Sequence, residues 1–205
     1  MKANRHLAVF AKAPRLGAVK TRLAADIGNE GALEFYRQTL TGVLARLSTD
    51  ATWQCWISLT PDAAVTAPPF WPDTYNAISQ GTGDLGDRMA RTIEALPPGP
   101  VALIGADIPA IEPHHIEAAF TALEDHDTVF GPAADGGYWL VGSNRSFGMA
   151  EMFKNVRWST QHALADTLIN VTAHGKSSAR LETLEDIDDG AAYQKWLTNA
   201  LSGGA

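Results

Sequence analysis

Cysteine and long apolar runs are both scarce in this sequence. With one cysteine in 205 residues, no disulfide can form within the chain, and we expect Cys55 to belong to the core. No apolar run approaches the roughly 18 residues that a membrane span requires. Lys12 also interrupts the N-terminal apolar run too early for a secretory signal. We therefore expect a cytoplasmic protein with no membrane partner.

Positive charge is in short supply as well. The chain has 16 Lys and Arg against 23 Asp and Glu, which gives a formal net charge of −7. A surface that binds nucleic acid usually shows the opposite bias, so we expect no nucleic-acid partner. Against this acidic background, any local group of cations suggests a small anionic ligand rather than a polymer.

The order of the sequence patterns is that of an α/β protein. Apolar runs of strand length alternate with amphipathic stretches of helix length, and no internal repeat divides the chain. We predict one domain over residues 1–201 and a tail, 202–205, that frays. Strands are predicted at residues 6–11, 52–60, 75–79, 101–105, 128–132 and, as an edge strand, 174–184. Helices are predicted at residues 29–47, 84–96, 113–125, 146–154, 159–170 and 191–201, and a loop at 61–72.

The scarce cations are concentrated in the loop that follows the first predicted strand. This loop contains a quarter of the positive charge of the chain within eleven residues, at Lys12, Arg15, Lys20 and Arg22. Backbone N–H groups and the dipole of a following helix favour phosphate at such a place, and the side chains add charge. We predict an anion site here; the alternative is a solvated basic turn.

The glycine patterns of the common phosphate-binding loops are missing from this segment. A Walker A motif ending at Lys20 would need glycines where the sequence has Pro14 and Val19, and G-x-G-x-x-G does not occur in the loop. If the loop holds phosphates, it does so with Lys and Arg side chains.

Two predicted helix starts have features that serve either structure or function. Gly81 and Gly83 allow close approach to a flat ligand, and Asp84 can cap the helix that follows; the alternative is a plain capped turn. Trp158 precedes the helix predicted at 159–170, whose cap is Ser159 or the next residue. We interpret Trp158 as a hydrophobic staple in preference to a pocket wall.

Carboxylates follow two of the predicted strands. Asp107 comes directly after the apolar run at 101–105, where open α/β sheets bind ligands, and this suits a Mg²⁺ or Mn²⁺ ligand. Capping or turn formation would also explain it. Four acids crowd residues 185–189 ahead of the last helix. They either complement the helix dipole or place a carboxylate opposite Asp107.

A third feature joins two strand-like runs. The sequence Asp135-Gly136-Gly137 is a hairpin signal. In a functional interpretation, the two glycines clear space for a substrate and Asp135 contacts it.

Five ordered motifs resemble those of an uncharacterised bacterial group of GT-A-type transferases. The resemblance runs from residue 7 to about residue 189, and the motifs are far more specific for the family than for an activity. The matching segments are Phe10-Ala11-Lys12-Ala13-Pro14 with Gly17 and Val19-Lys20-Thr21-Arg22-Leu23; Leu85-Gly86 with Arg88-Met89; Gly105-Ala106-Asp107-Ile108-Pro109; Gly131-Pro132 with Asp135-Gly136-Gly137-Tyr138; and Trp158-Ser159-Thr160.

The resemblance implies a fold and a range of activities. The fold is the α/β nucleotide-diphospho-sugar transferase fold (GT-A, Rossmann-like), which has three layers and a mainly parallel central sheet. Related members include phospholactate and molybdenum-cofactor guanylyltransferases, and some relatives are glycosyltransferases, including those of arsenosugar pathways.

The resemblance also implies roles for individual residues. Residues of the first loop would hold a triphosphate: Lys12, Lys20 and Arg22, helped by Arg15. Residues of the second helix start would meet the base or ribose: Gly81, Gly83 and Leu85. Metal would be bound by Asp107 and by a C-terminal acid, Asp186 or Asp188. Beside these implied roles, we expect the acceptor to border Asp135, Gly136 and Gly137. Where glycosyltransferases have an Asp-x-Asp element, this chain has Gly105 two residues before Asp107, which leans toward nucleotidyltransferases.

The sequence thus predicts a Mg²⁺- or Mn²⁺-dependent nucleotidyltransferase that uses an NTP and a small phosphorylated or acidic acceptor. Lys20, Arg22 and Asp107 are its expected catalytic residues. The first alternative is a glycosyltransferase with a nucleotide-sugar donor, and the second is a noncatalytic nucleotide-binding domain. The base, the acceptor and the choice between a monomer and a homodimer are left open.

Overall fold

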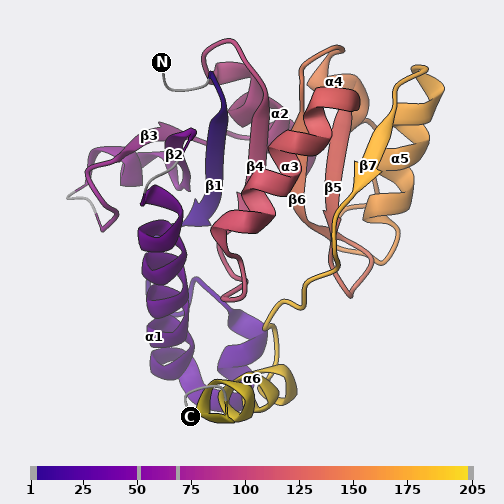
Figure 1. Ribbon diagram of the computed structural model, residues 1–205. Helices are drawn as coiled ribbons and strands as arrows, with labels where there is room; N and C mark the ends of the chain where they lie inside the picture. Colours follow the sequence, from indigo (N-terminus) through magenta and orange to yellow (C-terminus); the bar gives the residue numbers. More distant parts are fainter. Residues whose placement is uncertain (1–3, 50–51, 68–69, 203–205) are drawn as a thin grey trace.

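The computed structural model describes residues 4–49, 52–67 and 70–202. A seven-stranded sheet runs through the centre, in the order β3-β2-β1-β4-β6-β5-β7 (Figure 1). Its strands are β1 (His6–Lys12), β2 (Gln54–Thr60), β3 (Tyr75–Ser79), β4 (Val101–Gly105), β5 (Thr128–Pro132), β6 (Tyr138–Ser143) and β7 (Ser178–Arg180). The helices are α1 (Thr21–Ser48), the 3₁₀ helix η1 (Asp62–Thr66), α2 (Leu85–Ala95), α3 (Pro113–Asp125), α4 (Met149–Met152), α5 (Ala163–Ala173) and α6 (Gly190–Ser202).

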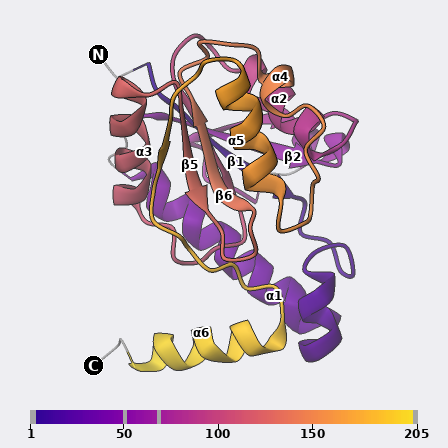
Figure 2. The ribbon, with the colours of Figure 1, turned by 90° about the vertical axis from the view of Figure 1, so that its right-hand side faces the viewer.

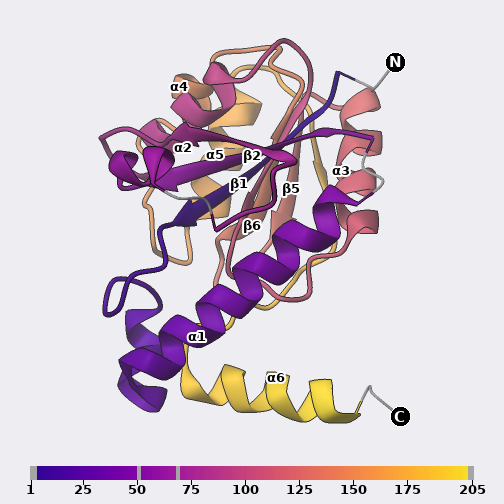
Figure 3. The ribbon, with the colours of Figure 1, turned by 90° about the vertical axis from the view of Figure 1, so that its left-hand side faces the viewer.

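Helices cover both faces of the sheet, as Figures 2 and 3 show from opposite sides. The C-terminal half of α1 and α3 pack on one face, and α2, α4 and α5 pack on the other. Side chains of β1 alternate between the two layers of the core: Leu7 and Val9 join the first, and Ala8 joins the second. All three are fully buried, as expected of a strand covered on both faces. The predicted three-layer α/β fold is confirmed.

Most of the sheet is parallel, as predicted. β1 pairs in parallel with β2 and β4, β2 with β3, and β5 with β7. Among the strands of the described residues, only β6 is antiparallel to its neighbours, because the Asp135-Gly136-Gly137 turn returns the chain beside β5 as the predicted hairpin. The carboxyl ends of all the parallel strands and the start of β6 therefore meet at one edge of the sheet. α6 and the first turns of α1 lie beyond this edge (Figure 1).

Several predicted elements are confirmed at their predicted bounds, namely the strands at 75–79, 101–105 and 128–132 and the helix at 113–125. The first helix begins earlier than the predicted 29, at Thr21, and is interrupted at Gly28, which has a φ of 79°. Gly28 separates these opening turns from the periodic stretch that predicted the helix, so the prediction began after it. The predicted loop at 61–72 contains η1.

The C-terminal half departs more from prediction. Of the helix predicted at 146–154, only Met149–Met152 is helical, and the edge strand predicted at 174–184 is reduced to Ser178–Arg180. The helix predicted at 159–170 begins at Ala163, and its predicted cap is wrong: His162 stands at the N-cap with no side-chain cap bond. The Thr160 hydroxyl instead donates to the carbonyl of Arg157, which forms a turn before the helix.

Within the described residues the last helix reaches Ser202, so the predicted tail at 202–205 begins inside α6, and residues 203–205 lie outside the described part. Cys55 is buried in the core, as predicted. Across the described residues, no helix is long and apolar enough to cross a bilayer.

Candidate functional site

A cavity of about 470 Å³ opens at the carboxyl edge of the sheet. This volume is within the range of small-molecule sites, and the position is where open α/β sheets bind ligands. Charged residues from five separate segments line it, namely Lys12, Lys20, Arg88, Asp107, Asp135 and Asp186. The parallel topology is what brings them together.

Lys20 lies at the centre of the charged part of this cavity. Its Nζ donates to Asp107 Oδ2 at 2.9 Å and to Asp188 Oδ1 at 2.7 Å, and only 4% of its side chain is exposed. Burial opposes the charge of the ammonium group, but the carboxylates of Asp107 and Asp188 outweigh it and raise the pKa of Lys20 above its ordinary value. The side chain of Lys20 is therefore charged and buried, with two carboxylate partners.

The backbone of Lys20 is unusual too. Its φ of 45° and ψ of 48° are left-handed, although it is not a glycine, and it stands at the N-cap of α1. This conformation costs about 1 kcal/mol or more, so contacts elsewhere must hold it. The two carboxylate contacts provide such a hold.

Asp186 is the third carboxylate of the group. Burial and the negative charges of Asp188, Asp135 and Asp107 raise its pKa from 3.8 to about 6, although Lys20 opposes the shift. Three neighbouring acids, of which Asp107 and Asp135 line the cavity, thus repel a charge on Asp186, and a bound cation would relieve that repulsion.

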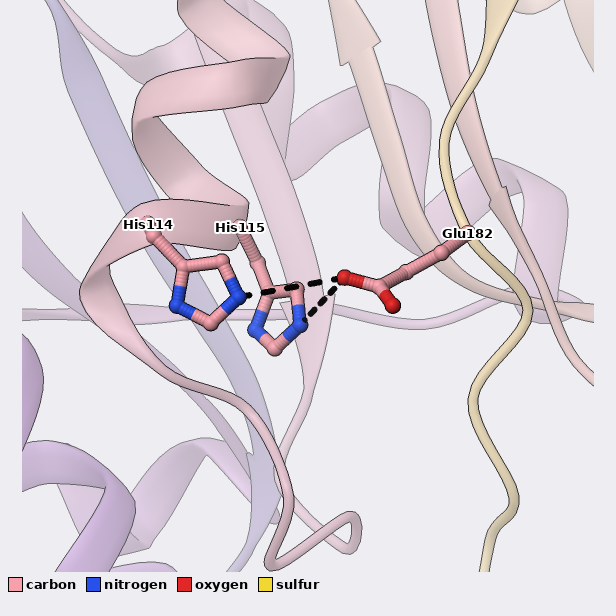
Figure 4. A group of neighbouring side chains, drawn as sticks. All are labelled: His114, His115 and Glu182. Carbon is pink, nitrogen blue, oxygen red and sulfur yellow. Dashed lines mark ion pairs between the residues drawn. The ribbon is translucent and has the colours of Figure 1, made fainter.

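The segment after β7 brings these C-terminal acids to the cavity, and several contacts fix its course. Leu184 N donates to Pro132 O at 3.2 Å, and Trp139 Nε1 donates to the carbonyl of Glu182 at 3.2 Å. The Glu182 carboxylate accepts from His115 Nε2 at 2.8 Å (Figure 4). After Arg180 the segment is no longer a regular strand, and these three contacts hold it in place instead.

His114, His115 and Glu182 could be mistaken for a metal site, since one ligand atom from each lies within 4.8 Å of the others. Figure 4 shows both imidazoles directed at Glu182. However, His115 Nδ1 accepts a hydrogen bond from the backbone N–H of Glu112 at 2.8 Å. A neutral imidazole that accepts at Nδ1 carries its proton at Nε2, so that nitrogen donates to Glu182 and has no lone pair for a metal. The group is a structural clamp.

The predicted phosphate-binding cations do not all reach the cavity. Lys12 lines it, with its Nζ 3.4 Å from the carbonyl of Ala18. Arg22 lies outside the lining, with a contact of 3.5 Å to Asp188 and 75% of its side chain exposed. Arg15 is exposed and also lies outside the lining.

Of the three residues predicted to contact a base or ribose, one lines the cavity and two do not. Leu85 lines the cavity, whereas Gly81 and Gly83 do not. Both glycines have positive φ, at 70° and 107°, so the turn before α2 by itself requires them. Asp84 caps α2 as predicted, by accepting from the backbone N–H of Asp87 at 2.9 Å.

At the hairpin turn, Asp135 and Gly137 line the cavity. Gly136 does not, and its φ is 87°. A Cβ on Gly136 would overlap the backbone of Gln161, and the Gly136 carbonyl accepts from Leu164 N at 3.1 Å. The space beside this glycine is therefore filled by the chain itself and not cleared for a substrate.

Sequence reasoning gave no role to Arg88 and Gln80. Arg88 lines the cavity over the ring of Phe10, 5.6 Å from its centroid, and donates to Gln80 Oε1 at 3.1 Å. Gln80 is buried, and its amide nitrogen donates to the carbonyls of Ala11 and Ser58. A signal for Arg88 existed in the sequence, because a cation in the first turns of a helix opposes the helix dipole and needs another reason to be there.

Trp158 corrects a prediction. It lines the cavity, and its ring is so close to Gly86 that a Cβ there would lie 2.8 Å from it. It also packs edge-on against Phe153. Trp158 is thus a wall of the cavity and not a staple for α5.

The carboxylates around Lys20 Nζ suit a hard divalent cation. Asp107 and Asp188 each direct one carboxylate oxygen at a single point, which Lys20 Nζ occupies. Oxygen ligands of this kind are those that Mg²⁺ and Mn²⁺ prefer. The residues present therefore fit such an ion.

Comparison with solved structures agrees with this geometry. The chain is similar to a protein of Desulfovibrio desulfuricans G20 named provisionally as a nucleotide-diphospho-sugar transferase, at 28% identity and a TM-score of 0.83, over 91% of this chain and 83% of that chain. It is also similar to CMP:2-keto-3-deoxy-manno-octonic acid synthetase in complex with CTP, at 12% identity and a TM-score of 0.61, over 98% and 100%. Glucosyl-3-phosphoglycerate synthase of Mycobacterium tuberculosis, in complex with Mn²⁺, UDP and phosphoglyceric acid, shares 11% identity at a TM-score of 0.56, over 96% and 75%.

The fold and the cavity define a transferase of the nucleotide-diphospho-sugar transferase superfamily, as the sequence resemblance implied. Within it, the chain belongs to the bacterial family DUF2064, described as an uncharacterized protein conserved in bacteria, whose family model matches residues 43–160. A comparison with proteins of curated function found no match.

Proposed function

We propose that this chain transfers a nucleotidyl group from an NTP to a small phosphorylated or acidic acceptor, with Mg²⁺ or Mn²⁺ as cofactor. The observation that carries the proposal is the convergence of Lys12, Lys20 and Asp107 on one cavity at the carboxyl edge of the sheet. Cations from one segment and carboxylates from two others are what a nucleotide with its metal ion requires.

Nucleotidyl transfer mainly requires that the substrates are positioned in line and that the negative charge of the phosphates is neutralised. An acceptor oxygen attacks the α-phosphorus of the NTP, the bond to the bridging oxygen breaks, and pyrophosphate leaves. Lys12 and Arg88 face the cavity and neutralise phosphate oxygens, while the exposed Arg15 and Arg22 add positive charge outside it. Asp107 with Asp188 or Asp186 would hold the ion, which supplies charge neutralisation at the phosphates.

The rest of the cavity accommodates the other parts of the substrates. Leu85 lies on the side of the α2 start, which suits the nucleoside, and Gly81 and Gly83 shape that turn. Asp135 and Gly137 border the acceptor on the side of the hairpin.

Two structurally similar proteins support this assignment. The synthetase similar to this chain binds CTP, and the glucosyl-3-phosphoglycerate synthase binds Mn²⁺, UDP and phosphoglyceric acid. Because the second of these proteins binds UDP, glycosyl transfer from a nucleotide-sugar is the alternative function. The aromatic side chains of Tyr138 and Trp158 on the cavity wall favour that alternative, because sugar rings pack on aromatic faces.

The test is thermal unfolding with the four NTPs and common nucleotide-sugars, each with and without Mg²⁺. A ligand that binds the native state raises the midpoint temperature of unfolding by mass action. The experiment therefore works without a known acceptor. A rise for one NTP with Mg²⁺, and none for the sugar donors, would support nucleotidyl transfer and identify the base. A rise for a nucleotide-sugar alone would support glycosyl transfer instead.

Asp107→Asn separates an enzyme from a binding module. In a metal-dependent transferase this variant loses the effect of Mg²⁺ on nucleotide binding, whereas Asp73→Asn, an exposed acid of the loop before β3, keeps it. If Mg²⁺ leaves nucleotide binding unchanged and Asp107→Asn has no effect, the chain is a noncatalytic nucleotide-binding domain.

A further inference from the structure

The ammonium group of Lys20 occupies the point at which a divalent ion would bind. Asp107 Oδ2 and Asp188 Oδ1 both lie within 3 Å of Lys20 Nζ. A Mg²⁺ ion contacts carboxylate oxygens at about 2.0–2.1 Å. An ammonium group has no lone pair and would repel such an ion, so the two cations cannot share these oxygens.

The exposed fractions of the three side chains show how a divalent ion would replace the Lys20 ammonium group at the two carboxylates. Asp107 and Asp188 are 38% and 39% exposed, so an ion can reach them from solvent, while Lys20 is 4% exposed beneath them. If an ion displaced Lys20 alone, a buried ammonium would be left without a partner, which is costly. A phosphate group in the cavity would give the long, flexible side chain a new partner.

We propose that Lys20 is a built-in counter-ion that competes with the divalent ion for Asp107 and Asp188. This inference rests on the proposed function and adds to it how binding of the ion is coupled to binding of the nucleotide. The ion alone binds weakly, because it must displace Lys20. The ion and the nucleotide bind together, because the phosphates take over Lys20 and free the two carboxylates.

The other cations near the cavity do not have this arrangement. Lys12 Nζ donates to the carbonyl of Ala18, in the same loop, at 3.4 Å. Arg22 reaches Asp188 at 3.5 Å from an exposed position. Lys12→Met is thus a matched control that removes one cation from the cavity and leaves Asp107 and Asp188 paired with Lys20.

The experiment measures Mn²⁺ binding to the protein without nucleotide, from the electron paramagnetic resonance signal of the free ion. Lys20→Met should bind Mn²⁺ about tenfold or more tightly than the wild-type protein, and Lys12→Met should bind it as the wild type does. Adding Asp107→Asn to Lys20→Met should abolish the gain, which places the ion at these carboxylates. Circular dichroism shows that each variant is folded.

A second variant of Lys20 tests the inference if Lys20→Met does not fold. Lys20→Gln keeps an N–H donor for the carboxylates and removes the charge, so it should also gain Mn²⁺ affinity. If neither folded variant binds Mn²⁺ more tightly than the wild type, the inference is wrong. That failure is distinct from failure of the proposed function, which appears as an absence of nucleotide binding by the wild-type protein, whatever the Lys20 variants do.

Discussion

Glu182 accepts a hydrogen bond from His115 Nε2 at 2.8 Å, and this contact ties the segment that carries Asp186 and Asp188 to the first turn of α3. His115 is buried, and its Nδ1 accepts from the backbone of Glu112, so the imidazole is fixed on both sides. The C-terminal acids therefore depend on a helix N-terminus that lies more than sixty residues before them in the chain.

Glu182→Ala should loosen that segment. The variant leaves His115 Nε2 buried without its acceptor, which lowers the free energy of unfolding by about 1–2 kcal/mol. Amide hydrogen exchange over residues 183–189 should become faster, because this clamp is one of the few contacts that hold an irregular segment. Urea denaturation and exchange measured by mass spectrometry check both effects.

Glu185→Ala is the control for this prediction. Glu185 is in the same segment, but its partner is Lys195 on α6, and both side chains are largely exposed. Removing an exposed pair of this kind changes stability by less than about 1 kcal/mol. Equal effects of the two substitutions would show that His115 does not fix the segment.

Gly136→Ala should destabilise the protein by about 2–4 kcal/mol. The residue has a φ of 87°, and a Cβ would overlap the backbone of Gln161. Gly148→Ala is the matched control, since Gly148 has a φ of −66° and nothing lies within 4 Å of its Cβ position. Urea denaturation of the two variants tests the prediction, and similar midpoints would contradict it.

The sequence predicted most of the fold because its strong patterns are local. The apolar run at 101–105 and the periodicity at 113–125 lie in elements that pack against the core along their whole length. Residues 174–184 do not form one continuous strand, because regular pairing with β5 is confined to Ser178–Arg180. The course after Arg180 depends on contacts with Trp139 and His115, which no local pattern shows.

The site was harder to predict in detail, although its main residues could be named. Asp107 was identifiable because it follows a buried strand, and Lys20 because it lies in a cationic loop. Their direct contact at 2.9 Å joins residues 87 positions apart, so it required the fold. For the same reason the sequence could not show that Trp158 lies against Gly86 and forms a wall of the cavity.

Asp186→Asn should stabilise the protein in a pH-dependent manner. The pKa of Asp186 is raised from 3.8 to about 6 in the folded state, so the native state holds its proton more tightly than the unfolded state does. Its contribution to stability is therefore favourable below about pH 4 and is lost as the pH rises through about 6. Asparagine cannot ionise, and the variant avoids that loss.

The expected difference is about 1 kcal/mol above pH 6, after allowance for solvent screening of a half-buried group, and it vanishes near pH 4. Urea denaturation at pH 4.5 and pH 8 measures it, with the exposed Asp73→Asn as the control. A constant difference between Asp186→Asn and the wild type at both pH values would show that the Asp186 charge is not responsible.

Arg88→Ala should weaken nucleotide binding and leave the fold nearly intact. The guanidinium group lies over Phe10 at the cavity wall and is held by Gln80 Oε1 at 3.1 Å. A charge-assisted hydrogen bond to a phosphate is worth about 1.5–3 kcal/mol, so the loss should weaken binding about tenfold or more. Arg37→Ala removes an exposed arginine on α1 and should change nothing. Isothermal titration with the nucleotide found in the thermal-unfolding experiment measures the effect. If Arg88→Ala binds that nucleotide as tightly as Arg37→Ala does, the phosphates lie on the side of Lys12 and Lys20, and Arg88 supports only the wall.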